Sequence, residues 1–164
     1  MGELSTFPVS YKVSGKRIVI VGDGEEALNK ARLALKTTAS VVIVPVISSK
    51  DRPNVGADIA EKYETSVLDG TALVFIAAKG DLADRVKADA RARGIPVNVV
   101  DVQEECDFFT PSIIDRAPLT VAVATEGDAP VLARLVRARI EALLPPDLGR
   151  MARLAGSLRE RVGQ

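Results

Sequence analysis

The sequence predicts an α/β protein built on a Rossmann-like, doubly wound parallel sheet. The first observation is a run of four β-branched residues, 18–21, which stops at a glycine pair and is followed by apolar residues at helical spacing. The second is that further apolar runs alternate with segments of helical periodicity. Four consecutive apolar residues suit a strand buried on both faces, as strands of a parallel sheet are. In such a sheet, ligands lie at the carboxyl ends of the strands.

Three further apolar runs predict the other long strands, at residues 41–44, 72–78 and 95–100. Between the last two, residues 82–92 have helical periodicity, with Asp81 as the expected N-cap and Gly94 as the expected C-cap. Residues 57–63 suit a short helix, and residues 64–68 suit a short edge strand. The residues expected at the carboxyl ends of the strands are Gly22, Val46, Ala78 and Asp101. We therefore expect a ligand near these four positions.

The glycine turn after the first strand is a candidate cofactor-binding loop. Gly22 and Gly24 permit a tight turn and a close backbone approach, and the helix that follows presents free N–H groups to an anion such as a pyrophosphate. A glycine pair by itself fits any tight turn from strand to helix equally well. Glu25 and Glu26 suit the dipole of the helix in its first turn. We therefore expect backbone groups, and not these side chains, to contact a phosphate.

The loop after the second strand departs from the usual NAD fingerprint. That fingerprint places an acidic residue about 20 positions beyond the glycines, where it binds the ribose. Here the place holds Pro45, Val46, Ile47 and Ser48, and Asp51 follows slightly later. Either backbone groups of this loop hold the adenosine, or Asp51 reaches back to it.

The pattern changes after Cys106. Residues 108–115 and 119–125 are two strand-like runs around a turn, Arg116-Ala117-Pro118, and predict a β-hairpin. Asp128 is the expected N-cap of a strongly amphipathic helix that ends at Pro145-Pro146, and its apolar stripe is expected to be core or subunit interface. A further amphipathic helix is expected over residues 148–162.

Composition argues against several classes of function. The chain of 164 residues has 22 basic and 22 acidic residues, one cysteine and no histidine. We therefore expect neither nucleic acid nor a membrane as partner, no intrachain disulfide, no metal site of the usual zinc type and no serine triad. No signal peptide or membrane span is expected, so the cytoplasm is the expected location. Acid–base chemistry would need a carboxylate, a hydroxyl, a lysine or a bound cofactor.

Several motifs carry a resemblance to a known family. They are VNVVD at 97–101, PSIIDRAPL at 111–119, GDAPVLAR at 127–134 and IEALLP at 140–145. Together with the glycine turn, they make the chain resemble the precorrin-2 dehydrogenase/sirohydrochlorin ferrochelatase family, the N-terminal module of siroheme synthase. The resemblance runs from about Phe7 to the C-terminus. It implies an NAD-binding domain over residues 1–110, a dimerisation segment over 111–145 and the start of a helical region over 146–164.

The resemblance also implies a function. It implies a homodimer whose cleft binds the tetrapyrrole, NAD-dependent oxidation of precorrin-2 to sirohydrochlorin, and Fe²⁺ insertion in bifunctional members. Two alternatives remain open: a non-catalytic module that binds a nucleotide or tetrapyrrole, and a ferrochelatase with weak dehydrogenase activity. The choice between NAD and NADP also remains open. The chain ends short of the family's complete helical region, so we interpret it either as a shortened chain or as a minimal member.

Site residues follow from the resemblance and from the strand ends. Asp101 matches the catalytic aspartate, and a carboxylate there can accept protons that leave the substrate; the alternative is that it only caps its loop. The expected cofactor-binding residues are Gly22, Asp23, Gly24, Glu25, Glu26, Ala27, Val46, Ile47, Ala78 and Lys79. Lys79 departs from the family pattern and is a candidate contact for a phosphate or a substrate carboxylate.

The expected substrate-binding residues are Asn98, which lies beside the aspartate in sequence, Thr125 and Arg116. Thr125 falls where family members carry a hydroxyl residue near the substrate cleft. Arg116 and Arg134 suit the carboxylates of an acidic tetrapyrrole, because a guanidinium can bind a carboxylate through two hydrogen bonds. The alternative is that these arginines form structural ion pairs across a dimer.

Overall fold

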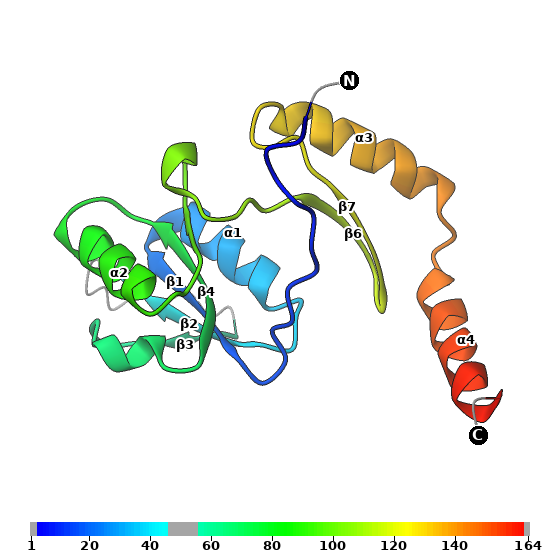
Figure 1. The fold of residues 1–164 in the computed structure, drawn as a ribbon, viewed down its shortest axis with the longest axis horizontal. Coiled ribbons are helices and arrows are strands. Elements are labelled where there is room, and N and C mark those ends of the chain that lie inside the picture. Colours follow the sequence, from blue (N-terminus) through cyan, green and yellow to red (C-terminus); the bar gives the residue numbers. More distant parts are fainter. Residues whose placement is uncertain (1–2, 46–55, 163–164) are drawn as a thin grey trace. The chain divides into compact units, whose positions relative to one another are not determined.

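The computed structural model describes residues 3–45 and 56–162, and the side chains up to residue 159 within the last helix. The chain forms two compact units (Figure 1). One unit comprises Pro8–Phe108, and the other comprises Met1–Phe7 together with Phe109–Gln164.

The first unit contains a parallel five-stranded sheet in the order β3-β2-β1-β4-β5. Its strands are β1 (Arg17–Gly22), β2 (Ser40–Val44), β3 (Asp58–Ile59), β4 (Thr71–Ala77) and β5 (Val97–Val99). Its α-helices are α1 (Gly24–Ala34) and α2 (Asp81–Ala92). All four strand pairings are parallel, so the predicted doubly wound sheet is confirmed.

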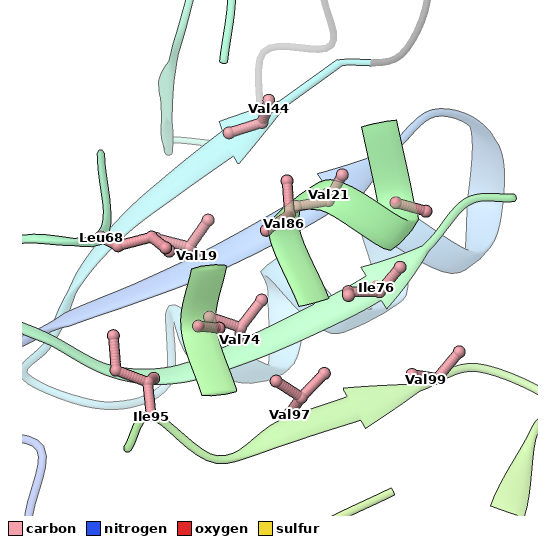
Figure 2. Packing of buried hydrophobic residues seen from close by; sticks show 12 residues of the cluster. Val19, Val21, Val44, Leu68, Val74, Ile76, Val86, Ile95, Val97 and Val99 are labelled. Atoms are coloured by element: carbon pink, nitrogen blue, oxygen red, sulfur yellow. The ribbon is translucent and has the colours of Figure 1, made fainter. Parts of the chain in front are cut away.

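The apolar run of β1 supplies both faces of the sheet. Val19 and Val21 belong to a buried cluster that includes Val86 of α2, and Figure 2 shows the side chains of this cluster. Ile18 and Ile20 belong to a second cluster with the alanines of α1. The four side chains are at most 3% exposed. Full burial of such a side chain stabilises a fold by about 1.5–3 kcal/mol, which explains why β1 carries no polar residue between its ends.

The predictions for residues 57–68 are wrong. The edge strand is β3, Asp58–Ile59, where we expected a helix, and a 3₁₀ helix occupies Thr65–Leu68, where we expected a strand. A strand of two residues is too short to show a period of two in the sequence. Leu68 is 1% exposed, and its burial anchors the 3₁₀ helix to the core.

The helix caps differ in part from the prediction. Asp81 is the first residue of α2 and not its cap, because Gly80, at φ +93°, precedes the helix. Gly94 ends α2 as expected: its φ is +67°, and its N–H donates to the carbonyl of Arg91 at 3.0 Å. Left-handed glycine is the usual way to terminate a helix.

The second unit contains the predicted hairpin and helices. Strands β6 (Ser112–Arg116) and β7 (Leu119–Val123) are antiparallel, and they are followed by α3 (Pro130–Leu143) and α4 (Leu148–Val162). The expected N-cap Asp128 is wrong, because Ala129 directly precedes α3 and donates its N–H to Oγ1 of Thr125 at 3.3 Å. Among the described residues, no helix is long and apolar enough to cross a membrane.

Candidate functional site

Strands β1, β4 and β5 end at the same edge of the sheet. Gly22 pairs with Ala77, and the N–H of Val100 donates to the carbonyl of Ile76 at 2.9 Å. The structure therefore brings the glycine turn, Ala78 and Asp101 to one edge, where a doubly wound sheet binds its ligands. Val46 and Ile47, and the alternative Asp51, lie outside the described residues.

The two glycines of the turn are required for different reasons. Gly22 has a φ of +142°, and a Cβ placed on it would lie 2.4 Å from the carbonyl oxygen of Ala77. This glycine therefore permits β1 and β4 to pack together. Gly24 has a φ of +77°, but a Cβ there would meet no described atom within 4 Å. Its outer side is open, so a ligand can approach its backbone.

The first turn of α1 presents backbone N–H groups beside Gly24. The first four N–H groups of a helix have no partner within it and carry the positive end of its dipole. Glu25 is held by Arg32 through an ion pair of 2.6 Å, and both side chains are more than half exposed. Ala27 is buried against the sheet, and Asp23 precedes the helix in an extended conformation. Open backbone beside Gly24 is thus the feature that fits a pyrophosphate.

Asp101 is held in a left-handed backbone conformation just beyond β5, with Val100 between them. Its φ is +63°, and its side chain is exposed. This conformation costs a residue with a Cβ roughly 1–2 kcal/mol, although aspartate tolerates it better than most. Strain of this kind is concentrated at functional positions. An exposed carboxylate at this edge is available to a bound substrate.

Lys30 is a candidate site residue that the sequence analysis missed. Its Nζ lies 5.4 Å from the centroid of the Phe75 ring, within reach of a cation–π interaction. Burial lowers the pKa of Lys30, while the nearby carboxylates of Glu26 and Asp101 act to raise it. The ammonium group therefore interacts electrostatically with residues from two segments of the site. The sequence does hint at a special role for Lys30, because its helical spacing places it within the apolar stripe of α1 that contains Ala27, Ala31 and Ala34.

Asn98 and Cys106 hold the chain segment around Asp101. Asn98 is 6% exposed, and its Nδ2 donates to the carbonyl of Phe108 at 2.9 Å and to Sγ of Cys106 at 3.4 Å. Sγ of Cys106 also accepts the N–H of Val99 at 3.2 Å. Burial raises the pKa of the Cys106 thiol, so the thiolate is disfavoured. The amide nitrogen of Asn98 is thus used within the fold, and its contact with substrate stays a prediction.

A small cavity adjoins the ends of β4 and β5. It has a volume of about 180 Å³, and its lining includes Ala78, Lys79, Asp84, Lys87 and Glu105. Nζ of Lys87 lies 2.6 Å from Glu105 and 3.1 Å from Asp84, and these hydrogen bonds raise its pKa. Lys79 is exposed. The two expected cofactor residues, Ala78 and Lys79, therefore line a hollow of mixed polar and apolar character at the start of α2.

The remaining expected substrate residues lie in the second unit. Nη1 of Arg116 is 3.3 Å from Glu141 of α3, which also pairs with Arg137. Arg116 therefore forms an ion pair within its own chain. Arg134 is exposed. The hydroxyl of Thr125 accepts the hydrogen bond that begins α3. In the part of the chain that the structure describes, no cluster of three or more acidic, cysteine or histidine side chains could hold a metal.

Comparison with known families agrees with this geometry. The family described as putative NAD(P)-binding matches residues 9–112, which span the sheet and the glycine turn. The chain belongs to this NAD(P)-binding family. A second family, described as sirohaem biosynthesis protein central, matches residues 116–143, which span most of the hairpin and α3. The two matches confirm the expected resemblance to the siroheme synthase module and the expected class of cofactor.

Similar proteins extend over nearly the whole chain. A siroheme synthase of Ectopseudomonas mendocina is 45% identical over 161 residues and matches 96% of this chain, which covers 35% of that protein. A siroheme synthase of Chromobacterium violaceum is 45% identical over 167 residues, and the match covers 95% of this chain and 34% of that protein. The chain thus spans about a third of the length of these relatives. A solved structure described as SirC, precorrin-2 dehydrogenase, has a TM-score of 0.80 at 16% sequence identity, and the match covers 97% of this chain and 81% of that one. This similarity confirms the fold.

Proposed function

We propose that this NAD(P)-binding chain oxidises precorrin-2 to sirohydrochlorin with NAD as hydride acceptor. The observation that carries the proposal is the similarity to siroheme synthases over 96% of the chain, at 45% identity. Two features of the structure support it. The open backbone of Gly24 at the start of α1 fits a pyrophosphate, and the exposed Asp101 lies at the same edge of the sheet.

In the proposed mechanism, the glycine turn binds the cofactor and Asp101 accepts a proton. When bound, NAD supplies the carbon that accepts a hydride from the substrate. The first N–H groups of α1 would hold the pyrophosphate, since a Cβ on Gly24 would meet no described atom within 4 Å other than its chain neighbours. The carboxylate of Asp101 would accept the proton that leaves the substrate as the hydride departs.

NAD is the proposed cofactor because the positions directly after β2 carry no basic residue; the first ones, Lys50 and Arg52, come six and eight positions after the strand. NADP-binding sheets of this type place an arginine near the ribose 2′-phosphate, after the second strand. The five residues after β2 are Pro-Val-Ile-Ser-Ser. We expect kcat/KM to be at least tenfold higher with NAD than with NADP. A preference for NADP would contradict this assignment without affecting the assignment of Asp101.

Substitution of Asp101 tests the proposed catalyst. Asparagine keeps the shape of the side chain and tolerates the left-handed backbone, so Asp101→Asn should fold and bind NAD like the wild type. Loss of a general base should lower the rate of sirohydrochlorin formation by about 10²–10⁴-fold. Glu104→Gln, at an exposed carboxylate three residues further on, is the matched control and should keep its activity. Wild-type turnover in Asp101→Asn would refute the role.

The same carboxylate supports iron insertion as a second proposed activity. Insertion of Fe²⁺ displaces protons from pyrrole nitrogens, and an exposed carboxylate can accept them. Here Fe²⁺ is a substrate. Siroheme formation from sirohydrochlorin and Fe²⁺ without NAD would support this activity, and Asp101→Asn should slow it as well.

We also propose that the chain forms a homodimer through its second unit. Only Ala133 is buried in α3, whereas Val131, Leu132, Leu135 and Leu143 are each more than half exposed. An apolar surface of this kind is typical of protein interfaces. Sedimentation equilibrium should give twice the chain mass of 17.4 kDa, and a monomer at micromolar concentration would contradict the dimer.

A further inference from the structure

The second unit contains a cavity lined by three arginines. It has a volume of about 440 Å³ and lies where α4 meets the turn between β6 and β7. Its lining includes Arg116 from the hairpin and both Arg150 and Arg153 from the first two turns of α4. We refer to it as the arginine cavity. The proposed function assigns nothing to Arg150 or Arg153.

Close backbone packing forms the arginine cavity. A Cβ placed on Gly149 would lie 2.4 Å from the carbonyl oxygens of both Arg116 and Ala117, so only glycine permits this contact. Nη1 of Arg153 donates to the carbonyl of Ala117 at 2.7 Å. The start of α4 is therefore seated directly on the hairpin turn, and the arginines come together from segments more than 30 residues apart in sequence.

Two acidic groups near the cavity, Asp115 and Glu141, have partners within the chain, and a third, Asp147, directly precedes α4 and is exposed. Oδ1 of Asp115 accepts the N–H of Ala117 at 3.0 Å, and Glu141 pairs with both Arg116 and Arg137. Nε of Arg116 is buried and has no hydrogen-bond acceptor among the described residues.

The position of Arg150 and Arg153 also favours an anion. Cations near the N-terminus of a helix oppose its dipole, and the first turn of α4 carries no acidic residue. The two residues are three apart, so they share one face of α4. Both are exposed at the mouth of the cavity and accessible from solvent. An anion between them would offset both charges and interact favourably with the helix terminus.

We propose that the arginine cavity binds the carboxylates of an organic polyanion. Guanidinium groups match a carboxylate through paired hydrogen bonds, and three of them on two segments suit a ligand with several carboxylates. Asp115 on the lining repels a doubly charged phosphate more than it repels single carboxylates. The ligand is either a free polycarboxylate or a tetrapyrrole with carboxylate side chains. The proposal does not depend on the reaction proposed above.

Calorimetric titration of the full chain with citrate at low ionic strength tests the site. Arg150→Gln combined with Arg153→Gln should weaken citrate binding at least tenfold. Arg159→Gln is the matched control, since it removes an exposed arginine of α4 that does not line the cavity, and it should change affinity less than twofold. Equal weakening by the control, or no weakening by the double variant, would overturn the proposal.

Two further measurements identify the class and source of the ligand. Inorganic phosphate should bind more weakly than citrate, and tighter phosphate binding would overturn the assignment to carboxylates. Uroporphyrin, a tetrapyrrole with eight carboxylates, should displace citrate if the natural ligand is a tetrapyrrole. Citrate binding that depends on the arginines but is not displaced by uroporphyrin would support a free polycarboxylate. Dehydrogenase activity, measured separately with Asp101→Asn, decides the proposed reaction independently of these results.

Discussion

Replacing Gly22 with alanine should destabilise the first unit far more than the same change at Gly24. The new Cβ at position 22 would lie 2.4 Å from the carbonyl oxygen of Ala77, whereas ordinary contact begins at 3.4 Å. Strands β1 and β4 would have to separate by about 1 Å at their carboxyl ends, and such overpacking costs about 1–3 kcal/mol. The positive φ adds about 1–2 kcal/mol. We therefore expect a loss of about 2–5 kcal/mol for Gly22→Ala.

Gly24→Ala is the matched control for that experiment. Its φ of +77° is also positive, but its Cβ would enter open space, so only the conformational cost of about 1–2 kcal/mol applies. Its larger effect should be on NAD, because the methyl group would stand where the pyrophosphate approaches the backbone; we expect at least a tenfold loss of affinity.

Urea unfolding and calorimetric titration with NAD measure the two effects separately. The unfolding midpoint should fall much further for Gly22→Ala than for Gly24→Ala, with similar m values. Equal stability of the two variants would refute the packing argument. Unchanged NAD affinity in Gly24→Ala would refute the assignment of this turn to the cofactor.

Two further predictions concern stability and pH. Burial, together with a hydrogen bond to Asp89, raises the pKa of Tyr63 from 10.0 to about 12. The neutral phenol therefore stabilises the fold below pH 10, and this contribution is lost as the pH rises towards 12. Because Tyr63 is only partly buried, solvent screening limits the loss of stability to about 1 kcal/mol. In melting curves at pH 9 and 11, Tyr63→Phe should remove this pH dependence. The same change of stability with pH in Tyr63→Phe as in the wild type would contradict the prediction. Burial lowers the pKa of Lys30, so the unfolded chain holds that proton more tightly and stability should rise with pH between the lowered value and 10.5. Lys30→Met should abolish this rise, Lys36→Met should keep it, and identical pH profiles for the two variants would exclude the effect.

Local pattern was sufficient to predict the main elements. The four-residue run of β1 and the alternation of strands with helices predicted the parallel sheet, because burial on both faces leaves a signature within a few residues. The bounds of α4 were predicted in the same way from its periodicity. The prediction failed at β3 and at the 3₁₀ helix, where two to four residues carry too little periodicity and the burial of Leu68 decides the conformation.

The candidate site was predictable only in part. Gly22, Ala78 and Asp101 were located from the order of strands, since parallel strands bring their carboxyl ends to one edge. Aspartate tolerates the left-handed backbone conformation of Asp101, but the residue type alone does not predict it. Lys30 was missed because a lysine within an apolar stripe is ambiguous until the neighbouring charges are placed. Asn98 was expected to contact substrate, yet its amide nitrogen bonds to the segment that follows β5.

The sequence by itself determined the class of fold, the family and the residues at the strand ends, because these depend on local periodicity and short motifs. Only the tertiary structure decided why Gly22 must be glycine, which charges surround Lys30, and how Arg116 meets Arg150 and Arg153. Each of these depends on contacts between residues far apart in the chain. Such contacts are set by how β4 packs on β1 and how α4 packs on the hairpin, and no local pattern encodes those distances.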